Sequence, residues 1–217
     1  MPKKRQLSPH KHRGIVYGAK KQFTPDKDTS PNLNMAGIRH VQGIVGALLY
    51  YACEVDNKLL MDISAILTHK SAATKCTASA IHQLLDCVAT YSKDGIIYHA
   101  SDMILCAHYN TAYLNESKAR IRAGSFIFLS EDNPIPWLNI PVLTLAQIIK
   151  FFMSSSAEAE LAGLLIMAKN MISLLQTLID IACPQPKSPI QTDNSTAAGV
   201  TNRTVVAKKI KSMYMRL

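Results

Sequence analysis

The sequence predicts an α/β fold from residue 96 onward, with a mixed sheet in the element order β-β-β-α-β-α. Apolar runs at 103–108 and 125–129 are short and lie on either side of a polar stretch, which is typical of paired strands. The strongest helical periodicity of the chain falls between 161 and 179, and the run at 190–193 can form a further strand. Three antiparallel strands and a helical crossover into a parallel strand would produce this order.

The expected elements of this sheet can be placed along the chain. They are strands near 102–109, 124–130, 142–152 and 188–193, a helix over 155–182 and a shorter helix from Ser195 to Val200. The long helix carries an apolar stripe that we expect to face the sheet, formed by Leu161, Leu164, Leu165, Ala168, Ile172, Leu175 and Ile179. Ser155 and Glu158 have the spacing of a capping box at the start of this helix.

A separate helical segment, residues 38–95, precedes the sheet. Apolar residues from Ile38 to Leu49 follow 3.6-residue spacing, and further helices are predicted over 57–67 and 73–90. The turn at 92–95 ends this segment. The chain is therefore predicted to consist of a basic, loop-rich arm at 1–37, a helical connection segment at 38–95 and an α/β domain at 96–217.

Positive charge is concentrated at both ends of the chain. The 217 residues have a formal net charge of +9; residues 1–40 carry nine Lys/Arg against two Asp, and residues 203–217 carry five basic residues and no acid. The interval 41–202 is slightly acidic. Basic ends that flank a core are typical of proteins that contact nucleic-acid phosphates, although charged tails also serve solubility alone.

Cysteine usage and hydropathy predict an intracellular protein, cytoplasmic or nuclear. The five cysteines are odd in number, widely spaced and without a C-x-x-C pair, so they predict reduced core thiols rather than disulfides or a zinc site. The basic N-terminus has no apolar segment behind it, unlike a secretory signal. The longest apolar runs are shorter than the ~20 residues that cross a bilayer, so no membrane partner is expected.

Three residues with oxygen-bearing side chains fall where one edge of the predicted sheet would collect them. Asn110 follows the first strand, Glu160 lies in the first turns of the long helix, and Asp193 follows the fourth strand. The carboxyl ends of neighbouring parallel strands are where α/β sites gather, and oxygen clusters suit magnesium. From spacing alone, isolated solvated acids remain the alternative. His108 and Cys106 share a strand face, but two residues are too few for a metal site and predict core packing.

Three ordered motifs give the chain a resemblance to a known family. They are GIVGALLYYACEVDNKLL at 43–60, SSSAEAELAGL at 154–164 and IQTDNSTAAGV at 190–200. Together with AHYNTAYLNESKARIRAGS at 107–125, they resemble the C-terminal part of the reverse transcriptase polyprotein of copia-type long-terminal-repeat retrotransposons. The first motif is similar to the end of the polymerase region that leads into the connection, and the others are similar to the ribonuclease H domain. The resemblance covers essentially the whole chain.

The resemblance implies a ribonuclease H-like fold that cleaves the RNA strand of an RNA–DNA hybrid with two magnesium ions held by acidic residues. Carried over residue by residue, the helix acid is Glu160 and the acid of the T-D-N motif is Asp193. Where the family has an aspartate on the first strand, this chain has Asn110, which keeps a carbonyl oxygen and loses the charge. The family also continues into a last strand with a further acid, whereas this sequence ends at MYMRL. We therefore expect a truncated domain whose cleavage is absent or strongly impaired.

Three functions are compatible with these residues. The first is a ribonuclease H-type endonuclease of retroelement origin, without DNA synthesis because the polymerase catalytic region is absent from the sequence. The second is a module that binds RNA–DNA hybrid or duplex backbones without base specificity and without cutting, through phosphate contacts from 1–40 and 203–217. The third is a decayed open reading frame without selected function. The sequence shows no interleaved aromatic and basic platform of the kind that binds single strands.

Overall fold

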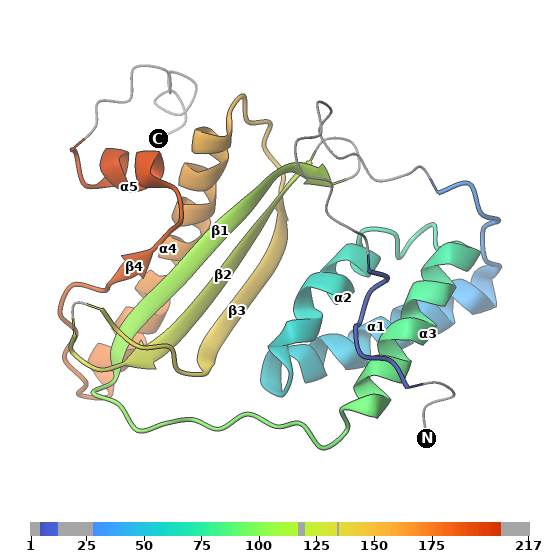
Figure 1. Ribbon diagram of the computed structural model, residues 1–217, viewed down its shortest axis with the longest axis horizontal. Helices are drawn as coiled ribbons and strands as arrows, with labels where there is room; N and C mark the ends of the chain where they lie inside the picture. Colours follow the sequence, from blue (N-terminus) through green and yellow to red (C-terminus); the bar gives the residue numbers. More distant parts are fainter. Residues whose placement is uncertain (1–4, 13–27, 117–119, 134, 205–217) are drawn as a thin grey trace. The chain divides into compact units, whose positions relative to one another are not determined.

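The computed structural model describes residues 5–12, 28–116, 120–133 and 135–204, and the chain divides into two compact units (Figure 1). In the first unit, Met1–Ile97, the regular elements of the described ranges are helices. The second unit, Tyr98–Leu217, contains the sheet. Each unit has its own buried core, which includes Ile63 and Leu84 in the helical unit and Ile127 and Met167 in the sheet unit.

The helical unit is formed by apolar segments with well-defined starts. Its elements are α1 (Met35–Glu54), the 3₁₀ turn η1 (Asn57–Leu59), α2 (Leu60–Leu67) and α3 (Lys75–Thr90). At the start of α1, the Asn34 side chain accepts a hydrogen bond from the Gly37 amide at 2.8 Å. Thr74 and Thr77 form a reciprocal capping box at the start of α3. These helices agree with the segments predicted from hydrophobic spacing.

The described N-terminal residues lie against the helical unit. The Gln6 amide donates to Thr90 Oγ1 at 3.0 Å, and Gln83 Nε2 donates to the Ser8 carbonyl at 3.2 Å. His10 Nδ1 lies 3.2 Å from Asp62 Oδ1. This part of the predicted arm is therefore held in place by side chains of the helices, while its segment 13–27 lies outside the described residues.

The sheet unit contains a four-stranded mixed sheet, which confirms the predicted α/β class. The strands are β1 (Ile104–Glu116), β2 (Arg120–Ser130), β3 (Pro141–Ile149) and β4 (Ile190–Gln191), in the spatial order β3-β2-β1-β4. The pairs β1–β2 and β2–β3 are antiparallel, whereas β4 pairs with β1 in parallel. Helix α4 (Ser156–Asp180) connects β3 to β4, and α5 (Ser195–Thr201) follows β4 and packs beside α4 (Figure 1).

The strands differ in length from the expected ones for local reasons. The β1–β2 ladder extends well past the apolar runs, because Arg122 Nε donates to Glu116 Oε1 at 2.6 Å and thereby joins polar parts of the two strands. Strand β3 ends at Ile149, three residues before the predicted end at residue 152. Strand β4 is reduced to two residues within the predicted 188–193.

Helix α4 packs one face on the sheet and forms the main core of this unit. Residues of β1, β2 and α4 share a buried cluster, made of Leu105, Ala107, Tyr109, Ile127, Met167, Met171 and Leu178. A second cluster lies under the first half of α4, made of Ile121, Ala123, Ile149, Met153, Ala159 and Ala162. The predicted capping box is only half formed: Ser155 Oγ accepts from the Glu158 amide, but the Glu158 carboxylate accepts from the Ser154 amide and hydroxyl instead.

The stripe predicted to bury α4 is partly wrong. Leu165, Ile172 and Ile179 are exposed, whereas the small residue Gly163 and two methionines of the helix face the sheet. Among the described residues, α4 is the one helix long and apolar enough to span a membrane by length and composition. The inner face of α4 packs on the sheet and contributes to both buried clusters of this unit.

Gly163 sets the distance between α4 and β1. A Cβ atom at this position would lie 2.5 Å from Thr111 Cγ2, with Tyr109 Cδ2 at 3.7 Å and Ala123 Cβ at 3.8 Å. A separation of 2.5 Å is far below van der Waals contact between carbon atoms. The backbone of α4 therefore approaches β1 as closely as it does because residue 163 has no side chain.

We expect Gly163→Ala to destabilise the sheet unit by about 1 to 3 kcal/mol, because the added methyl group must displace Thr111 or the whole helix. The free energy of unfolding can be measured by urea titration, followed by far-UV circular dichroism and by fluorescence of Trp137. Gly124→Ala is the matched control, because its Cβ would meet atoms at ordinary contact distances of 3.8 Å or more. Equal stability of the two variants would contradict the close approach.

Candidate functional site

Glu160 is a buried carboxylate in the second turn of α4. Its side chain is held toward the sheet by the main chain of β1, because Glu160 Oε1 accepts a hydrogen bond from the Thr111 amide at 3.2 Å. Only 5 % of the residue is exposed. The other carboxylate oxygen, Oε2, is buried and has no hydrogen-bond partner among the described residues. Burying a carboxylate oxygen without a hydrogen-bond partner destabilises the folded state, so the presence of one at this position requires an explanation.

The electrostatic environment disfavours the charged form of Glu160. Burial raises the pKa of Glu160 above its ordinary value, and the negative charge of Asp193 raises it further. The Thr111 amide and side chain act in the opposite direction and lower the pKa. Glu160 and Asp193 are therefore close enough to repel each other, although they come from different elements.

Two hydroxyl groups of β1 lie in the same buried region. Thr111 Oγ1 and Tyr109 Oη are both inaccessible to solvent and without a hydrogen-bond partner in the described part of the chain. Burial raises the pKa of the Tyr109 phenol, and the charges of Glu160 and Asp193 raise it as well. Thr192 lies near the phenol and lowers this pKa, without meeting hydrogen-bond geometry at Oη. Both hydroxyls point to the α4 side of β1, as expected for residues two apart on a strand.

Asp193 follows the short parallel strand β4. The register pairs Ala107 with Ile190 and His108 with Gln191, and the same register, continued for two residues past the end of β4, would bring Asp193 level with Asn110. Asp193 is exposed, and the next residue, Asn194, begins α5 by accepting a hydrogen bond from the Ala197 amide at 2.9 Å. The end of β4 thus presents Asp193 at the carboxyl end of the β1–β4 pair.

The structure places Asn110 differently from Glu160. Even-numbered residues of β1 face away from α4, as Cys106 shows by packing with Phe128, and Asn110 belongs to this set. Asn110 is exposed, and its side chain makes no hydrogen bond within the ranges described. The residue that contacts Glu160 is therefore Thr111, while Asn110 shares only its level along the sheet with Asp193.

The side-chain oxygens of this region are ligands of the type that hard cations bind, but few of them carry negative charge. The described residues contain no group of three or more His, Cys, Asp or Glu side chains that could hold a metal ion. Glu160 and Asp193 supply two carboxylates, and the unpartnered Glu160 Oε2, Thr111 Oγ1 and Tyr109 Oη supply oxygens without partners. This donor set fits a single magnesium ion better than two. Magnesium binding at Glu160, Asp193 and Asn110 stays a prediction.

His108 and Cys106 pack as core residues. The His108 ring meets the Phe128 ring edge-on, with 5.2 Å between centroids, and burial lowers the pKa of the imidazole. Burial raises the pKa of the Cys106 thiol to about 11, which keeps it protonated near neutral pH. Of the other cysteines, Cys53 and Cys76 are exposed, so the expectation that all five are core thiols is wrong for these two.

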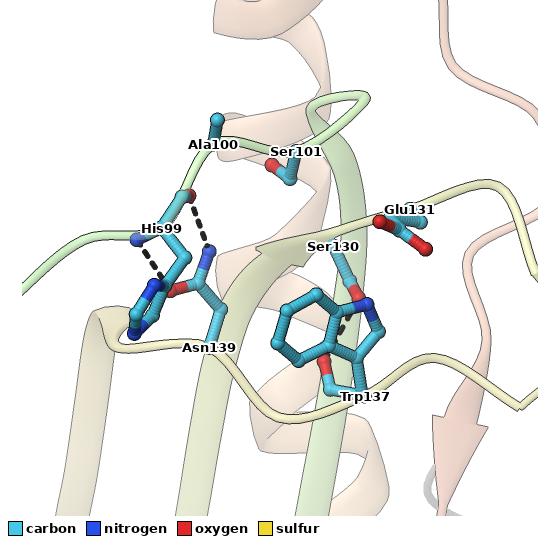
Figure 2. Close-up of a pocket in the computed structure, with 7 residues that line it drawn as sticks. All are labelled: His99, Ala100, Ser101, Ser130, Glu131, Trp137 and Asn139. Carbon is cyan, nitrogen blue, oxygen red and sulfur yellow. Dashed lines mark hydrogen bonds between the residues drawn. The ribbon is translucent and has the colours of Figure 1, made fainter.

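A small hollow lies at the end of the sheet opposite to Glu160, and hydrogen bonds within its lining hold the surrounding segments together. It has a volume of about 10 Å³, so it holds one water molecule at most. Figure 2 shows Asn139 bridging to His99: the Asn139 amide nitrogen donates to the His99 carbonyl at 2.9 Å, and its oxygen accepts from the His99 amide at 3.1 Å. Ser130 Oγ donates to the Trp137 carbonyl at 2.8 Å. The two Asn139 bonds fasten the loop after β2 to the segment before β1, and the Ser130 bond fixes this loop on the end of β2.

Sequence reasoning did not single out the two buried hydroxyls. Tyr109 and Thr111 flank Asn110, and the alternation of strand side chains turns them to the face opposite to it. The alternation of side chains along the strand could have identified them. Leu105, Ala107 and Tyr109 are two residues apart from one another, which assigns the odd-numbered residues of this strand to the core face. Comparison with protein-family models, with curated proteins and with solved structures finds no match to this chain.

We expect Glu160→Gln to stabilise the protein at neutral pH. Since burial raises the pKa of Glu160 in the folded state, the stability that this group contributes falls as pH rises from below its ordinary value of 4.5 through the raised value. Glutamine removes this penalty and keeps an oxygen for the Thr111 amide. The free energy of urea unfolding should exceed that of the natural chain at pH 7, and the difference should shrink in acid.

The matched control is Glu131→Gln, on the loop after β2 in the same unit. The difference in free energy of unfolding between this variant and the natural chain should be about the same at the two pH values. A Glu160→Gln variant that is less stable than the natural chain at pH 7 and equally so in acid would contradict the destabilising effect of the buried charge.

Proposed function

We propose that the unit beginning at Tyr98 is a ribonuclease H-like domain that binds RNA–DNA hybrids and whose magnesium-dependent cleavage is strongly impaired. In this proposal the chain derives from the reverse transcriptase polyprotein of a copia-type retrotransposon, as the motifs at 43–60, 154–164 and 190–200 suggest. The topology supports it: three antiparallel strands are followed by α4 and by a strand that pairs in parallel on the far side of β1.

The observation that carries the proposal is the buried carboxylate of Glu160, which has an unpartnered oxygen and is influenced by the charge of Asp193 from a distant part of the sequence. Glu160 is bonded to the main chain of β1, and the charge of Asp193 after β4 acts on it. Both residues are those that the resemblance assigns to the metal site. A buried acid whose pKa is raised by burial and by a nearby carboxylate is typical of functional sites, as is a position beside the carboxyl end of a parallel strand.

The roles of the residues follow from their positions. Glu160 and Asp193 would hold a divalent ion, and the unpartnered Glu160 Oε2 would be one of the oxygens available to it. When bound, magnesium activates water and stabilises charge on the phosphodiester. The Thr111 amide orients the Glu160 carboxylate, and burial excludes water from its inner side. The resemblance assigns a further ligand to position 110, where Asn110 has no charge and faces away from α4, so we expect lowered metal affinity and impaired cleavage.

A non-catalytic role in binding hybrids or duplexes is the second candidate function. The neutral amide of Asn110 favours it, together with the basic residues of 1–40 and 203–217 in the sequence. Such binding would use phosphate contacts, would lack base specificity and would weaken steeply with salt. A cytoplasmic or nuclear location belongs to this proposal, because RNA–DNA hybrids occur there.

We expect Asn110→Asp to raise magnesium-dependent cleavage of an RNA–DNA hybrid by about tenfold or more, because it restores a carboxylate at the position where the resemblance has the first-strand acid. Cleavage is measured with a hybrid labelled on its RNA strand, with magnesium and with a chelator. The double variant Asn110→Asp/Glu160→Gln should lose the gain, since ligands of one site act together.

Asn133→Asp is the matched control for this experiment. It adds the same charge at the other end of the sheet and keeps an oxygen that accepts from the Ile135 amide. If Asn110→Asp and Asn133→Asp cleave equally little while both bind the hybrid, the non-catalytic role is the better account. Failure of both variants and of the natural chain to bind the hybrid would contradict the proposed function as a whole.

A further inference from the structure

A groove of about 350 Å³ lies at the end of the sheet where β1 ends and α4 begins. In Figure 1 this is the end that carries the arrowhead of β1, where the connection from β3 to α4 passes. The floor of the groove is formed by Ile121, Ile149 and Met153, which belong to the buried cluster under the first half of α4. The groove is therefore supported by packed core residues of the strands and of the connection.

Two adjacent phenylalanines line this groove and face solvent. Phe151 is 64 % exposed and Phe152 is 82 % exposed, although each could bury a large apolar surface elsewhere. They follow the last residues of β3, where a longer strand was predicted. Large aromatic side chains exposed side by side in a groove mark a binding surface more often than a single exposed apolar residue does.

The backbone holds these aromatic residues in a fixed position. Immediately after them, the Met153 carbonyl accepts a hydrogen bond from the Tyr113 hydroxyl at 3.4 Å. The Ser154 amide then donates to Glu158 Oε2 at 2.8 Å. The connection is thus fastened to β1 and to α4 on the residues that follow the aromatic pair, and β3 fixes it on the other side. An aromatic surface held in this way loses little conformational entropy when a ligand binds.

The charged side chains that line the groove in the described part of the chain are basic. Arg120 and Lys150 are among its lining residues, and none of the described lining residues is acidic. Lys150 is exposed and directly precedes the phenylalanines. Aromatic rings beside cationic groups complement a ligand that carries flat rings and regularly spaced negative charges.

We propose that this groove binds a segment of single-stranded nucleic acid, with bases stacked on Phe151 and Phe152 and phosphates near Lys150 and Arg120. Stacking on aromatic side chains, combined with a basic lining, is the general way in which proteins hold unpaired strands without reading their sequence. The groove supplies the aromatic and basic platform that the linear sequence did not reveal. The inference goes beyond the proposed function, because it requires neither a metal ion nor cleavage.

The position of the groove favours nucleic acid over an anionic membrane. Ala159, the residue before Glu160, packs in the same buried cluster as the floor residues, so the groove lies at the end of α4 that carries Glu160. Helices that lie on a membrane surface present a long apolar face, whereas this surface is a short connection around a groove. A volume of about 350 Å³ is in the range that small-molecule ligands occupy.

The test measures binding of a short fluorescein-labelled oligothymidylate to the full chain by fluorescence anisotropy. Phe152→Ala should weaken binding about fivefold or more, which is the low end of what one stacked base contributes. Tyr50→Ala, an aromatic residue of α1 that is 73 % exposed, is the matched control and should leave the affinity unchanged. Both side chains are exposed, so circular dichroism should show that the variants fold normally.

The charges are tested in the same assay across a series of salt concentrations. Lys150→Gln should reduce the slope of log affinity against log salt by about 0.7, the value for one phosphate of a single strand. Lys169→Gln, an exposed lysine on α4, should leave the slope unchanged. The binding assay contains a chelator and no magnesium, so a failure of cleavage and a failure of this proposal are measured separately.

Two results would overturn the proposal. The first is an equal affinity of Phe152→Ala and Tyr50→Ala for the oligonucleotide. The second is binding of the natural chain to phosphatidylserine vesicles, lost in Phe152→Ala, without binding to the oligonucleotide. That outcome would assign the groove to a membrane surface.

Discussion

The close approach of α4 to β1 is the constraint on which the sheet unit depends. Without a side chain at Gly163, the helix backbone comes near enough to Thr111 for the methionines one and two turns later to fill the core over β1. One turn earlier, the same approach brings the carboxylate of Glu160 to the Thr111 amide. Packing and the candidate site therefore share a single geometric origin, and neither can be changed without the other.

This arrangement stores an unfavourable interaction at the place where chemistry is proposed. Glu160 is buried among apolar side chains and is repelled by Asp193, and its Oε2 has no partner in the described part of the chain. A protein under selection for stability alone would place an apolar residue at this position. The local rule that buried polar groups are paired is broken here by three oxygens from α4 and β1, and such exceptions concentrate at functional sites.

The sequence predicts the elements better than it predicts their faces. Apolar runs and helical spacing located the helices and the sheet order, because these signals are local. The stripe of α4 was misassigned at Leu165 and Ile172, since a helix that is apolar on both sides offers no pattern to choose between them. The exposure of Phe152 was not predicted for the same reason, because Phe152 continues the apolar segment that forms β3. Glu160 and Asp193 were singled out by motif. The contact between Thr111 and Glu160 was not, because it depends on the close approach of α4 to β1 at Gly163, which is a feature of the tertiary structure.

The shortness of β4 has a consequence for the dynamics of the sheet unit. Only two residue pairs and the bond from the Ala107 amide to the Pro189 carbonyl join this strand to β1, while β1 and β2 are paired over most of their length. Segments with so few backbone bonds open locally without global unfolding. Asp193 follows this weakly paired edge, so a local opening of the edge would move Asp193 away from Glu160. Any ligand that bridges the two carboxylates would also order the edge of the sheet.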